Sequence, residues 1–536
     1  MNFRANSYKY PSRRTLVYGA RGMTAATQPL AAQAGLDMLK AGGNATDAAV
    51  AMAACLAVVE PTSNGIGGDN FALVWQDGEL FGMNSSGPAP ALMDGEALLA
   101  EGRTAMPLYG WGAVTVPGAP AGWAALNERF GRLPLEQVLA PAVYYAEEGF
   151  PVSPTVSFLW KKAFAVFEKK LSGEEFAPLF ESFTTGGRAP EPGELWRSPA
   201  QAETLRKIAA TGAKSFYTGE LAEAIDAFSR RFNGALRFGD LASFSTEWVK
   251  PISVNYRGYD IWEIPPNGQG ITALIALNIL KHFELHERDC ARSFHLQIEA
   301  IKQAFAETLA EVGDPGCMRM SSEELLSEEL AAARAAEIDE ERAVLPTDRR
   351  QSSGGTVYFA AADSEGSMVS MIQSNYRGFG SGLCVPGTGI TLHNRGNNFS
   401  LDRESPNFCR AGRRPYHTII PGFITKDGEA LGPFGVMGAF MQPQGHLQAI
   451  VNMTNFELNP QEALDAPRWQ WTEGKKVLLE HGVPDYIARE LAAMGHEISV
   501  EHDLSSFGRG QIILRDRFGS LVGATEQRAD GAVAAW

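Results

Sequence analysis

The amino-acid sequence predicts a globular α+β protein, because helix patterns dominate its first part and strand patterns dominate its last part. Residues 23–61 hold two helix-like segments, whereas the chain after residue 356 is rich in β-branched and aromatic runs. Hydrophobic residues make up 45% of the 536 residues and charged residues 20%, which is typical of a chain with a large buried core. The length fits one large layered domain or roughly two to four smaller ones.

Two helices are expected near the N-terminal end of the chain. The first spans 28–40, where apolar residues recur every three or four positions, and it ends at Gly42. Asn44 or Thr46 can cap the second helix, which continues to about Glu60. The second helix is expected to pack closely on a sheet, because it contains many small residues, namely Ala48, Ala49, Ala51, Ala53 and Ala54.

Further elements follow along the chain. A glycine-rich turn over 64–69 leads into a strand over 71–75. A charged helix begins near Ser321 and gives way to an exposed linker that ends at Gly355. The other expected elements are a helix over 134–149, mostly helices over 197–285 with a strand near 252–263, and helices near 460–466 and 484–494.

The strand pattern that starts at Thr356 predicts a β-hairpin. One strand begins at Thr356 and a second covers 368–373, with a turn that begins at Asp363. This register places Thr356 opposite Gln373, within one residue of Ser374. The sequence therefore predicts two hydroxyl side chains close together at the open end of the hairpin.

A threonine at the start of this strand, directly after Gly354 and Gly355, suits self-cleavage. Its hydroxyl can attack the preceding carbonyl, an N→O shift forms an ester, and hydrolysis frees the threonine amine. That amine can then act as the general base for the same hydroxyl. The alternative is that Thr356 is an ordinary buried strand residue, and the strand pattern by itself favours this alternative.

Charge and cysteine content exclude several classes of function. The formal net charge is −15, and an acidic surface repels nucleic acid and anionic membranes, so neither is expected as a partner. The five cysteines form no CxxC pair and are odd in number, which argues against a disulfide framework and a structural zinc site.

The segment before Arg21 has no apolar core, and the apolar stretch 45–59 is shorter than the about 20 residues that span a bilayer. These features predict a cytoplasmic protein.

Motifs for metal and nucleotide sites are weak. His282 and His286 have the i, i+4 spacing of a zinc site, but no glutamate follows the first histidine. The chain has no P-loop and no GxSxG nucleophile elbow, and its glycine-rich stretch at 378–382 lacks the GxGxxG spacing. No metal and no cofactor are therefore expected.

Short ordered motifs extend from about Arg21 to the C-terminus. Those of the first part include Ala41-Gly42-Gly43-Asn44-Ala45, Glu60-Pro61, Gly65-Ile66-Gly67-Gly68-Asp69 and Pro117-Gly118. Those of the last part include Gly354-Gly355-Thr356, Ser374-Asn375, Phe379-Gly380-Ser381-Gly382, Asn398-Phe399-Ser400, Arg414-Pro415 and Asp465-Ala466-Pro467-Arg468. Through these motifs the chain resembles the γ-glutamyltransferase (glutathione hydrolase) family of N-terminal-nucleophile hydrolases.

The resemblance implies a four-layered αββα sandwich and a precursor that cleaves itself. Cleavage between Gly355 and Thr356 would give a large chain of residues 1–355 and a small chain of residues 356–536. In this family the two chains form one intertwined domain and associate as a heterodimer. The expected substrate is a small-molecule amide.

The resemblance also implies roles for individual residues. Thr356 falls at the family's nucleophile, and Ser374 falls at the threonine whose hydroxyl supports that nucleophile and the self-cleavage. Gly438 and Ala439 fall at two successive glycines whose backbone amides form the oxyanion hole. An alanine keeps its backbone N–H, so the hole is expected to persist if the φ angle suits alanine.

The expected substrate pocket departs from the family pattern. The family binds the glutamyl α-carboxylate with an arginine, but the matching region, 88–94, has none. Arg395 and Asn398 stand where the family holds the α-amino group with a glutamine and an acidic residue. A cationic Arg395 would repel an ammonium group and favour a carboxylate, unless it is a surface or structural arginine. The other pocket positions are Tyr376 with the adjacent Asn375, in place of an asparagine, and His417 with Thr418, in place of two hydroxyl residues.

The segment between Ser400 and Arg414 is short where many members of the family insert a loop that closes the pocket. An open site favours hydrolysis over transfer to an acceptor amine. The sequence therefore predicts a self-processing amidohydrolase for a small carboxylate-bearing amide, such as oxamate or a glutaryl amide. The alternatives are a glutathione hydrolase or γ-glutamyltransferase acting on γ-glutamyl amides, and a non-catalytic relative that keeps the fold.

Overall fold

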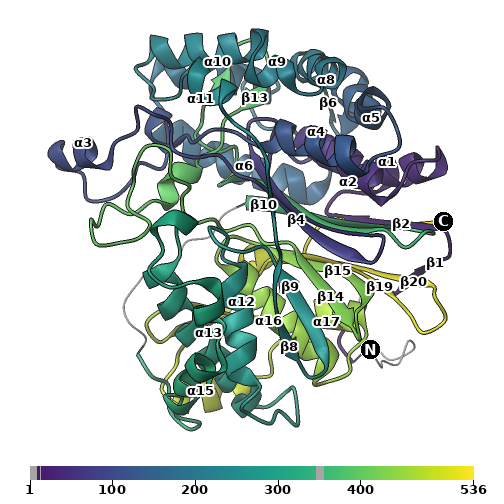
Figure 1. The fold of residues 1–536 in the computed structure, drawn as a ribbon, viewed down its shortest axis with the longest axis vertical. Coiled ribbons are helices and arrows are strands. Elements are labelled where there is room, and N and C mark those ends of the chain that lie inside the picture. The colour runs from purple at the N-terminus through teal and green to yellow at the C-terminus, as the bar shows by residue number, and fades with distance from the viewer. Residues whose placement is uncertain (1–8, 12–13, 346–354) are drawn as a thin grey trace.

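The computed structural model describes residues 9–11, 14–345 and 355–536. They form two seven-stranded sheets that face each other, with a layer of helices on the outer face of each sheet (Figure 1). The α+β class and the four-layered arrangement expected from the sequence are thereby confirmed. The linker expected just before Gly355 falls in 346–354, outside the described residues.

Both sheets combine strands from distant parts of the chain. In the first sheet, the order is β21 (Ala532–Ala535), β2 (Gly22–Ala26), β10 (Gly355–Asp363), β11 (Met368–Tyr376), β3 (Asp69–Gln76), β4 (Glu79–Ser85) and β7 (Glu247–Val249). In the second sheet, the order is β1 (Val17–Gly19), β20 (Leu521–Thr525), β19 (Arg509–Arg515), β15 (Glu429–Met437), β14 (Gly422–Lys426), β9 (Tyr259–Glu263) and β8 (Ile252–Tyr256). The central pair of the first sheet, β10 with β11, is the hairpin that the sequence predicts.

Helices cover the outer face of each sheet (Figure 1). On the side of the first sheet lie α1 (Pro29–Lys40), α2 (Ala45–Val59), α4 (Ala119–Phe130), α5 (Leu135–Glu148), α6 (Pro154–Lys170), α8 (Pro199–Thr211), α9 (Lys214–Tyr217), α10 (Glu220–Arg231) and α11 (Phe238–Ala242), of which α8, α9 and α10 are farther from the sheet than α1, α2 and α4. Those beside the second sheet are α12 (Gly270–Leu280), α13 (Ala291–Glu311), α14 (Ser322–Leu325), α15 (Glu328–Ala336), α16 (Met441–Thr454), α17 (Pro460–Asp465) and α18 (Asp485–Ala493). In the described ranges, no helix is both long enough and apolar enough to cross a membrane.

The remaining elements are short and lie outside the two main sheets. They are the helices α3 (Gly95–Ala100) and α7 (Ala177–Phe183), the paired strands β5 (Phe150–Pro151) with β6 (Leu195–Trp196) and β12 (Cys384–Val385) with β13 (Ile390–Thr391), and the three strands β16 (Trp469–Glu473), β17 (Lys476–Glu480) and β18 (Glu497–Glu501).

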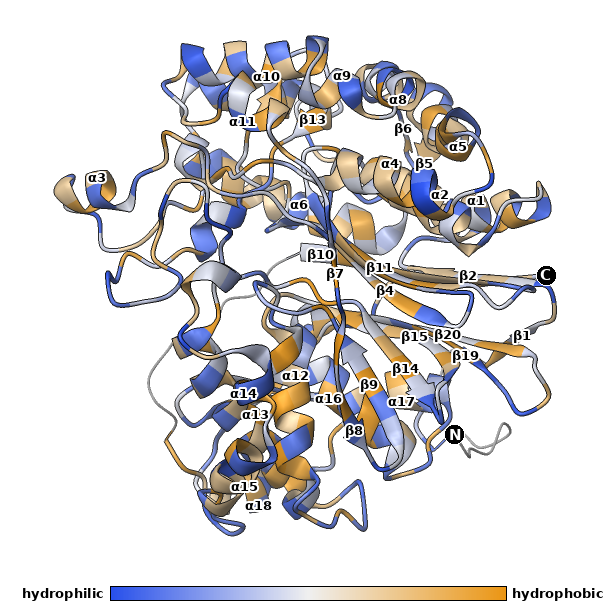
Figure 2. Cartoon of the chain, in the orientation of Figure 1, coloured by the Kyte–Doolittle hydropathy of each residue, from blue (hydrophilic) through white to orange (hydrophobic). Residues whose placement is uncertain are grey.

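Apolar side chains fill the space between the two sheets. The cluster there includes Phe71, Tyr358, Ile372 and Phe423, all fully buried. Figure 2 shows the hydrophobic residues on the sheets and on helices such as α12. The sheets approach closely at Gly435, where an added Cβ would lie 2.4 Å from the Tyr358 ring. Only a glycine leaves room for that ring, so this position sets the spacing of the sheets near the start of β10.

Helices α1 and α2 confirm the two N-terminal helices expected from the sequence. The Asn44 side chain accepts from the backbone N–H groups of Thr46 and Asp47, and the Asp47 side chain accepts from the Asn44 N–H. This reciprocal capping box fixes the start of α2. All residues of α2 are buried, which explains why it is built from small side chains that permit close packing.

Three sequence expectations differ from the structure. The single strand expected near 252–263 is two strands, β8 and β9, because Arg257 and Gly258 both take positive φ angles and turn the chain. The charged helix expected from Ser321 consists of the short helices α14 and α15, and Ser327 caps the second of them. The strand-rich end of the chain also contains α16, which follows β15 and is almost entirely buried.

The hairpin has a different register from the one predicted. Val357, rather than Thr356, pairs with Gln373, and Gly355 pairs with Tyr376, so the register shifts at Thr356. The turn causes the first offset, because Asp363 Oδ1 accepts from the backbone N–H of Ser367 and widens the loop. A bulge then sets two residues of β11, Ser374 and Asn375, opposite the single residue Thr356 of β10. Thr356 therefore lies beside Ser374, and the predicted proximity of the two hydroxyl side chains is confirmed.

Candidate active site

The hydroxyls of Thr356 and Ser374 converge on the carbonyl of Gly355. Thr356 Oγ1 donates to that oxygen over 2.7 Å, and Ser374 Oγ lies 2.9 Å from it in donor geometry. The two hydroxyl oxygens are 3.1 Å apart, and the backbone N–H of Tyr376 donates to Ser374 Oγ over 2.7 Å. The Tyr376 N–H thus fixes the Ser374 oxygen as an acceptor and directs its proton toward Gly355 or Thr356. This arrangement polarises the peptide bond that precedes Thr356.

Gly355, at the predicted cleavage site, packs against the turn between α2 and β3. A Cβ on Gly355 would lie 3.2 Å from the carbonyl oxygen of Thr62 and 3.3 Å from Cα of Ser63, so a larger residue would crowd this turn. The backbone N–H of Asn375 donates to the Ser63 carbonyl over 3.3 Å. The turn holds Gly355 and the end of β11 in place from one side.

Gly438 and Ala439 follow the last residue of β15 and lead into α16. Their φ angles are 141° and 52°, so Ala439 adopts the left-handed conformation that an alanine accepts only at a cost of about 1–3 kcal/mol. The Gln269 side-chain amide donates to the Ala439 carbonyl over 2.8 Å and stabilises this conformation. Within the described residues, the backbone N–H groups of Gly438 and Ala439 have no hydrogen-bond acceptor. The φ angle of Ala439 is thus one that does not suit alanine, contrary to the condition set in the sequence analysis, and the role of the pair as an oxyanion hole stays a prediction.

Arg395 makes an internal ion pair that the sequence did not reveal. Its Nε donates to Asp69 Oδ2 over 3.0 Å, and its Nη1 donates to Thr418 Oγ1 over 2.7 Å. The guanidinium carbon lies 4.7 Å from the centre of the Tyr376 ring, and the whole side chain is buried. The charge of Arg395 is therefore compensated inside the protein, and its binding of a substrate carboxylate stays a prediction.

His417 completes this buried cluster. Its Nε2 lies 2.7 Å from Asp69 Oδ2, and burial together with the nearby Arg395 lowers the pKa of His417 to about 4. The ring is neutral at pH 7, so Nε2–H donates to Asp69, while Nδ1 accepts from the backbone N–H of Ile419. Burial raises the pKa of Asp69, but the charge of Arg395 and the bond to His417 outweigh it and hold that pKa well below its usual range.

The two asparagines predicted for the pocket differ in their surroundings. Asn375 is fully buried, and its side-chain amide donates to Thr391 Oγ1 over 3.0 Å. Asn398 is half-buried at the end of a short 3-10 turn that begins at Arg395, and its side-chain Nδ2 has no partner among the described residues. Asn375 Oδ1 likewise has no partner among the described residues, so each asparagine keeps one polar atom that a ligand could bind.

A pocket of about 310 Å³ opens beside Gly355. Arg377, Arg509 and Lys162 line it, and the sequence analysis singled out none of these residues. Arg377 directly follows Tyr376, a predicted pocket position, and this adjacency was the available signal. Arg509 begins β19 and belongs to no motif, so only the folded chain brings it to this place.

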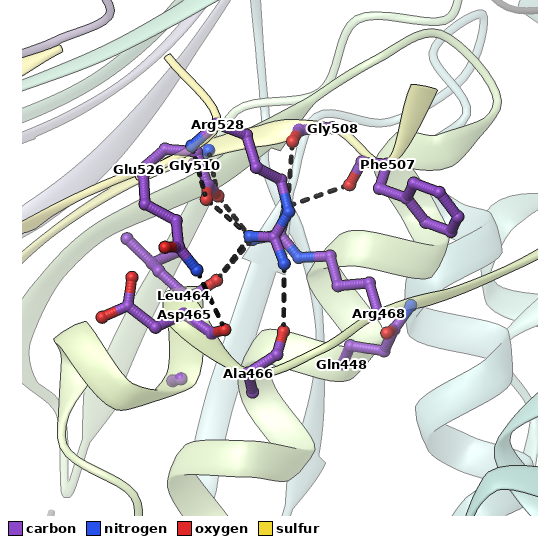
Figure 3. Close-up of polar contacts among 12 residues, drawn as sticks. Gln448, Leu464, Asp465, Ala466, Arg468, Phe507, Gly508, Gly510, Glu526 and Arg528 are labelled. Atoms are coloured by element: carbon purple, nitrogen blue, oxygen red, sulfur yellow. Dashed lines mark hydrogen bonds and ion pairs between the residues drawn. The ribbon is translucent and has the colours of Figure 1, made fainter. Parts of the chain in front are cut away.

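A buried ion network holds the turn that precedes Arg509 (Figure 3). Arg468 Nη1 donates to the carbonyls of Phe507 and Gly508 over 2.9 and 3.0 Å, and its Nη2 donates to Glu526 Oε2 over 2.6 Å. The same carboxylate oxygen accepts from the backbone N–H of Gly510 over 3.1 Å. The residues on both sides of Arg509 are thereby fixed by buried charges.

Among the described residues, His295, Glu299 and His496 are the one group with the geometry of a metal site. His295 Nδ1 and His496 Nε2 lie 2.8 Å apart, and His295 Nε2 lies 2.7 Å from the Asp339 carbonyl oxygen. Lys302 Nζ donates to Glu299 Oε1 over 2.6 Å and already neutralises the carboxylate. This group is a hydrogen-bonded network with its own internal cation, and His282 with His286 is not part of it.

Comparison with known proteins identifies the relatives of this chain. The sequence model of the family described as gamma-glutamyltranspeptidase matches residues 31–536. The glutathione hydrolase-like YwrD proenzyme of Bacillus subtilis is 35% identical over 525 residues, covering 96% of this chain and 98% of the relative. The oxamate amidohydrolase proenzyme of Klebsiella pneumoniae is 34% identical over 530 residues, again covering 96% and 98%. The crystal structure of a cephalosporin acylase from Bacillus halodurans is 55% identical, with a TM-score of 0.95 and coverage of 100% of this chain and 99% of that one.

Proposed function

The chain belongs to the γ-glutamyltranspeptidase family, and from that premise we propose that Thr356 is the nucleophile of a self-processing enzyme. The family and the relatives make the protein a hydrolase that acts on amide C–N bonds. The observation that carries the residue assignment is the contact of two hydroxyls, those of Thr356 and Ser374, with the carbonyl oxygen of Gly355.

Self-cleavage begins when Thr356 Oγ1 attacks the carbonyl carbon of Gly355. The Ser374 hydroxyl, 2.9 Å from the carbonyl oxygen, donates to the negative charge that develops there. The C–N bond then breaks, the hydroxyl proton passes to the leaving amine, and an ester joins the two residues. Water hydrolyses the ester, which leaves a carboxylate on Gly355 and a free α-amine on Thr356.

The freed amine of Thr356 serves as the general base in turnover. The hydroxyl loses its proton to this amine and attacks the amide carbon of the substrate. The backbone N–H groups of Gly438 and Ala439 donate to the oxyanion, and the proton then passes to the leaving amine. Water hydrolyses the acyl ester on Thr356. The short segment over 401–413 leaves the site open, which favours water over an acceptor amine.

We assign residues 1–355 and 356–536 to a large and a small chain that stay together after cleavage. In the first sheet, β10 and β11 of the small chain lie between β2 and β3 of the large chain. In the second sheet, β14 of the small chain pairs with β9 of the large chain. Main-chain hydrogen bonds in both sheets thus support a stable heterodimer.

A small carboxylate-bearing amide is the proposed substrate, and glutathione is the alternative. One relative is named for oxamate and one solved structure for cephalosporin, whereas another relative is named as glutathione hydrolase-like. Region 88–94, where the family's carboxylate-binding arginine is expected, contains no cation. The absence of that arginine favours substrates other than γ-glutamyl amides.

The proposed function is tested with the purified wild-type protein. We expect two fragments on a denaturing gel, and N-terminal sequencing of the smaller one should begin Thr-Val-Tyr-Phe. The cleaved protein should hydrolyse oxamate or a glutaryl amide with a higher kcat/KM than glutathione. A different N-terminal residue would refute the assignment of Thr356, and a preference for glutathione would make the protein an ordinary glutathione hydrolase.

Replacing Ser374 by alanine should slow both cleavage and turnover. The variant loses the hydroxyl that donates to the Gly355 carbonyl, and a hydrogen bond to a developing charge contributes about 1.5–3 kcal/mol, so we expect rates to fall roughly 10- to 200-fold. The time course of fragment formation on a gel and kcat of the cleaved product measure the effect. Ser374→Thr restores a hydroxyl and is the matched control. Unchanged rates in Ser374→Ala would show that this residue is part of the strand and has no role in cleavage or turnover.

A further inference from the structure

We propose that the pocket beside Gly355 binds the carboxylate of an ω-carboxyacyl amide through Arg377 and Arg509. The inference rests on the proposed function, because it names the substrate class and the specificity residues of the same site. It moves the carboxylate-binding role away from Arg395, whose charge is already paired with Asp69.

The charge of the pocket is the first observation. Its lining includes three cationic side chains, Arg377, Arg509 and Lys162, and no acidic residue. The whole chain carries a formal charge of −15, so a concave surface of purely positive charge stands out against the rest. Such a surface attracts and orients an anion.

Arg377 lacks the partners that would neutralise it. Within the described ranges, its buried Nε has no hydrogen-bond acceptor, and no ion pair involves its guanidinium. The guanidinium carbon lies 5.4 Å from the centre of the Tyr376 ring, which positions the side chain without compensating its charge. A buried donor without an acceptor is unfavourable, and a planar carboxylate is the acceptor that suits a guanidinium best.

Arg509 is the second donor and is only 6% exposed. Its Nη1 lies 3.3 Å from Glu60 Oε1, whereas its buried Nε has no acceptor in the described part of the chain. Burial raises the pKa of Glu60, and the second oxygen of that carboxylate accepts from Thr27 Oγ1 over 2.6 Å. Glu60 thus occupies Nη1 of Arg509 and compensates part of its charge, and Nε is the donor that remains for a ligand, so Arg377 is the main carboxylate-binding residue and Arg509 the secondary one. Lys162 Nζ lies 3.2 Å from Asp503 Oδ2, so Lys162 is the least available of the three cations for binding an anion.

Part of the pocket lining is apolar and suits a methylene chain. It is formed by one face of α6, with Leu159, Ala163, Val166 and Phe167. The volume of about 310 Å³ is at the lower end of the range known for small-molecule sites, about 300–1,000 Å³. A two-carbon acid such as oxamate would leave the apolar wall uncovered, whereas a glutaryl group covers it and reaches the arginines.

The position of the pocket indicates which half of the substrate it holds. Gly355 lines the pocket, and Gly355 is the acyl half of the peptide bond that Thr356 attacks in the precursor. A substrate that follows the same course places its acyl group on this side of the nucleophile and its leaving amine on the other. The carboxylate that meets Arg377 is therefore on the acyl group.

The test compares two p-nitroanilides that differ in charge alone, the glutaryl compound and its uncharged glutaramoyl isostere. We expect Arg377→Gln to lower kcat/KM for the glutaryl compound about 10- to 100-fold and to change the value for the isostere less than about threefold. Arg377→Lys keeps the charge and should recover part of the activity. Arg230→Gln, which changes an exposed arginine in α10, is the matched control and should behave like wild type.

A binding measurement separates this inference from the proposed function. Glutarate titrated calorimetrically into the wild-type protein should bind, and Arg377→Gln should weaken that binding by about tenfold or more. If the wild type hydrolyses no amide but this loss of binding is seen, the proposed function fails and the anion site stands. The inference is overturned if glutarate does not bind, if Arg377→Gln leaves binding and kcat/KM unchanged, or if it lowers kcat/KM equally for both anilides.

Discussion

Replacing Thr356 by alanine should leave the protein as a single polypeptide without amidase activity. The substitution removes the Oγ1 atom that lies against the Gly355 carbonyl, so neither the N→O shift nor the attack on substrate can occur. Removal of a nucleophile typically lowers kcat more than about 10⁴-fold, which is below most detection limits. A denaturing gel of the purified variant and a glutaryl anilide assay measure both effects.

The matched control for this variant is Thr356→Ser. Serine keeps a hydroxyl at the same atom position, so cleavage and some activity should persist, although the rotamer is less restricted without the methyl group. Normal cleavage in Thr356→Ala would place the nucleophile elsewhere. Loss of cleavage in both variants, with normal folding, would show that the methyl group is needed to position the hydroxyl.

The second large effect is expected for the buried pair of Arg395 and Asp69. Arg395→Met keeps a long side chain but leaves the Asp69 carboxylate without its cation, in a place where both side chains are fully buried. Breaking a buried ion pair by removing one partner costs about 3–5 kcal/mol. We therefore expect the free energy of unfolding to fall by about that amount in urea titrations of the uncleaved Thr356→Ala chain.

A double-mutant cycle shows whether the loss comes from this pair. Asp69→Asn should also destabilise the protein, but Arg395→Met combined with Asp69→Asn should cost less than the two single changes together, because no uncompensated charge remains. Additive losses, or a loss below about 1 kcal/mol for Arg395→Met, would contradict the role of Arg395 as an internal counter-ion. Such an outcome would favour the predicted role of Arg395 in binding the substrate carboxylate.

Several parts of the fold and site follow from sequence patterns alone. The Asn44 capping box, the alanine-rich helix after it and the hairpin at Thr356 are local features, and local features leave local signals. The resemblance to a known family supplied the layered fold, which the chain adopts. The proximity of Thr356 and Ser374 was also predictable, because it depends on one hairpin.

Features that depend on distant contacts were not predictable. The widened turn at Asp363 shifts the register of the hairpin by one residue, and the bulge opposite Thr356 adds a further shift; neither has a sequence signature of its own. The ion pair of Arg395 forms with Asp69, the first residue of β3, which is far away in the chain. The meeting of Arg377 and Arg509 beside Gly355 likewise requires both sheets to be assembled.

In both sheets, strands from before Gly355 pair with strands from after it, and this pairing affects how the protein refolds and how long it persists. While the chain is continuous, folding is unimolecular, since every strand that must pair is tethered to its partner. After a cut at Gly355, the strands of the small chain remain interleaved with β2, β3 and β9 of the large chain, and refolding from the denatured state becomes a bimolecular reaction that depends on concentration. We therefore expect a protein cut at this position to persist because its interleaved chains separate slowly, so that its lifetime is governed by a rate rather than by an equilibrium.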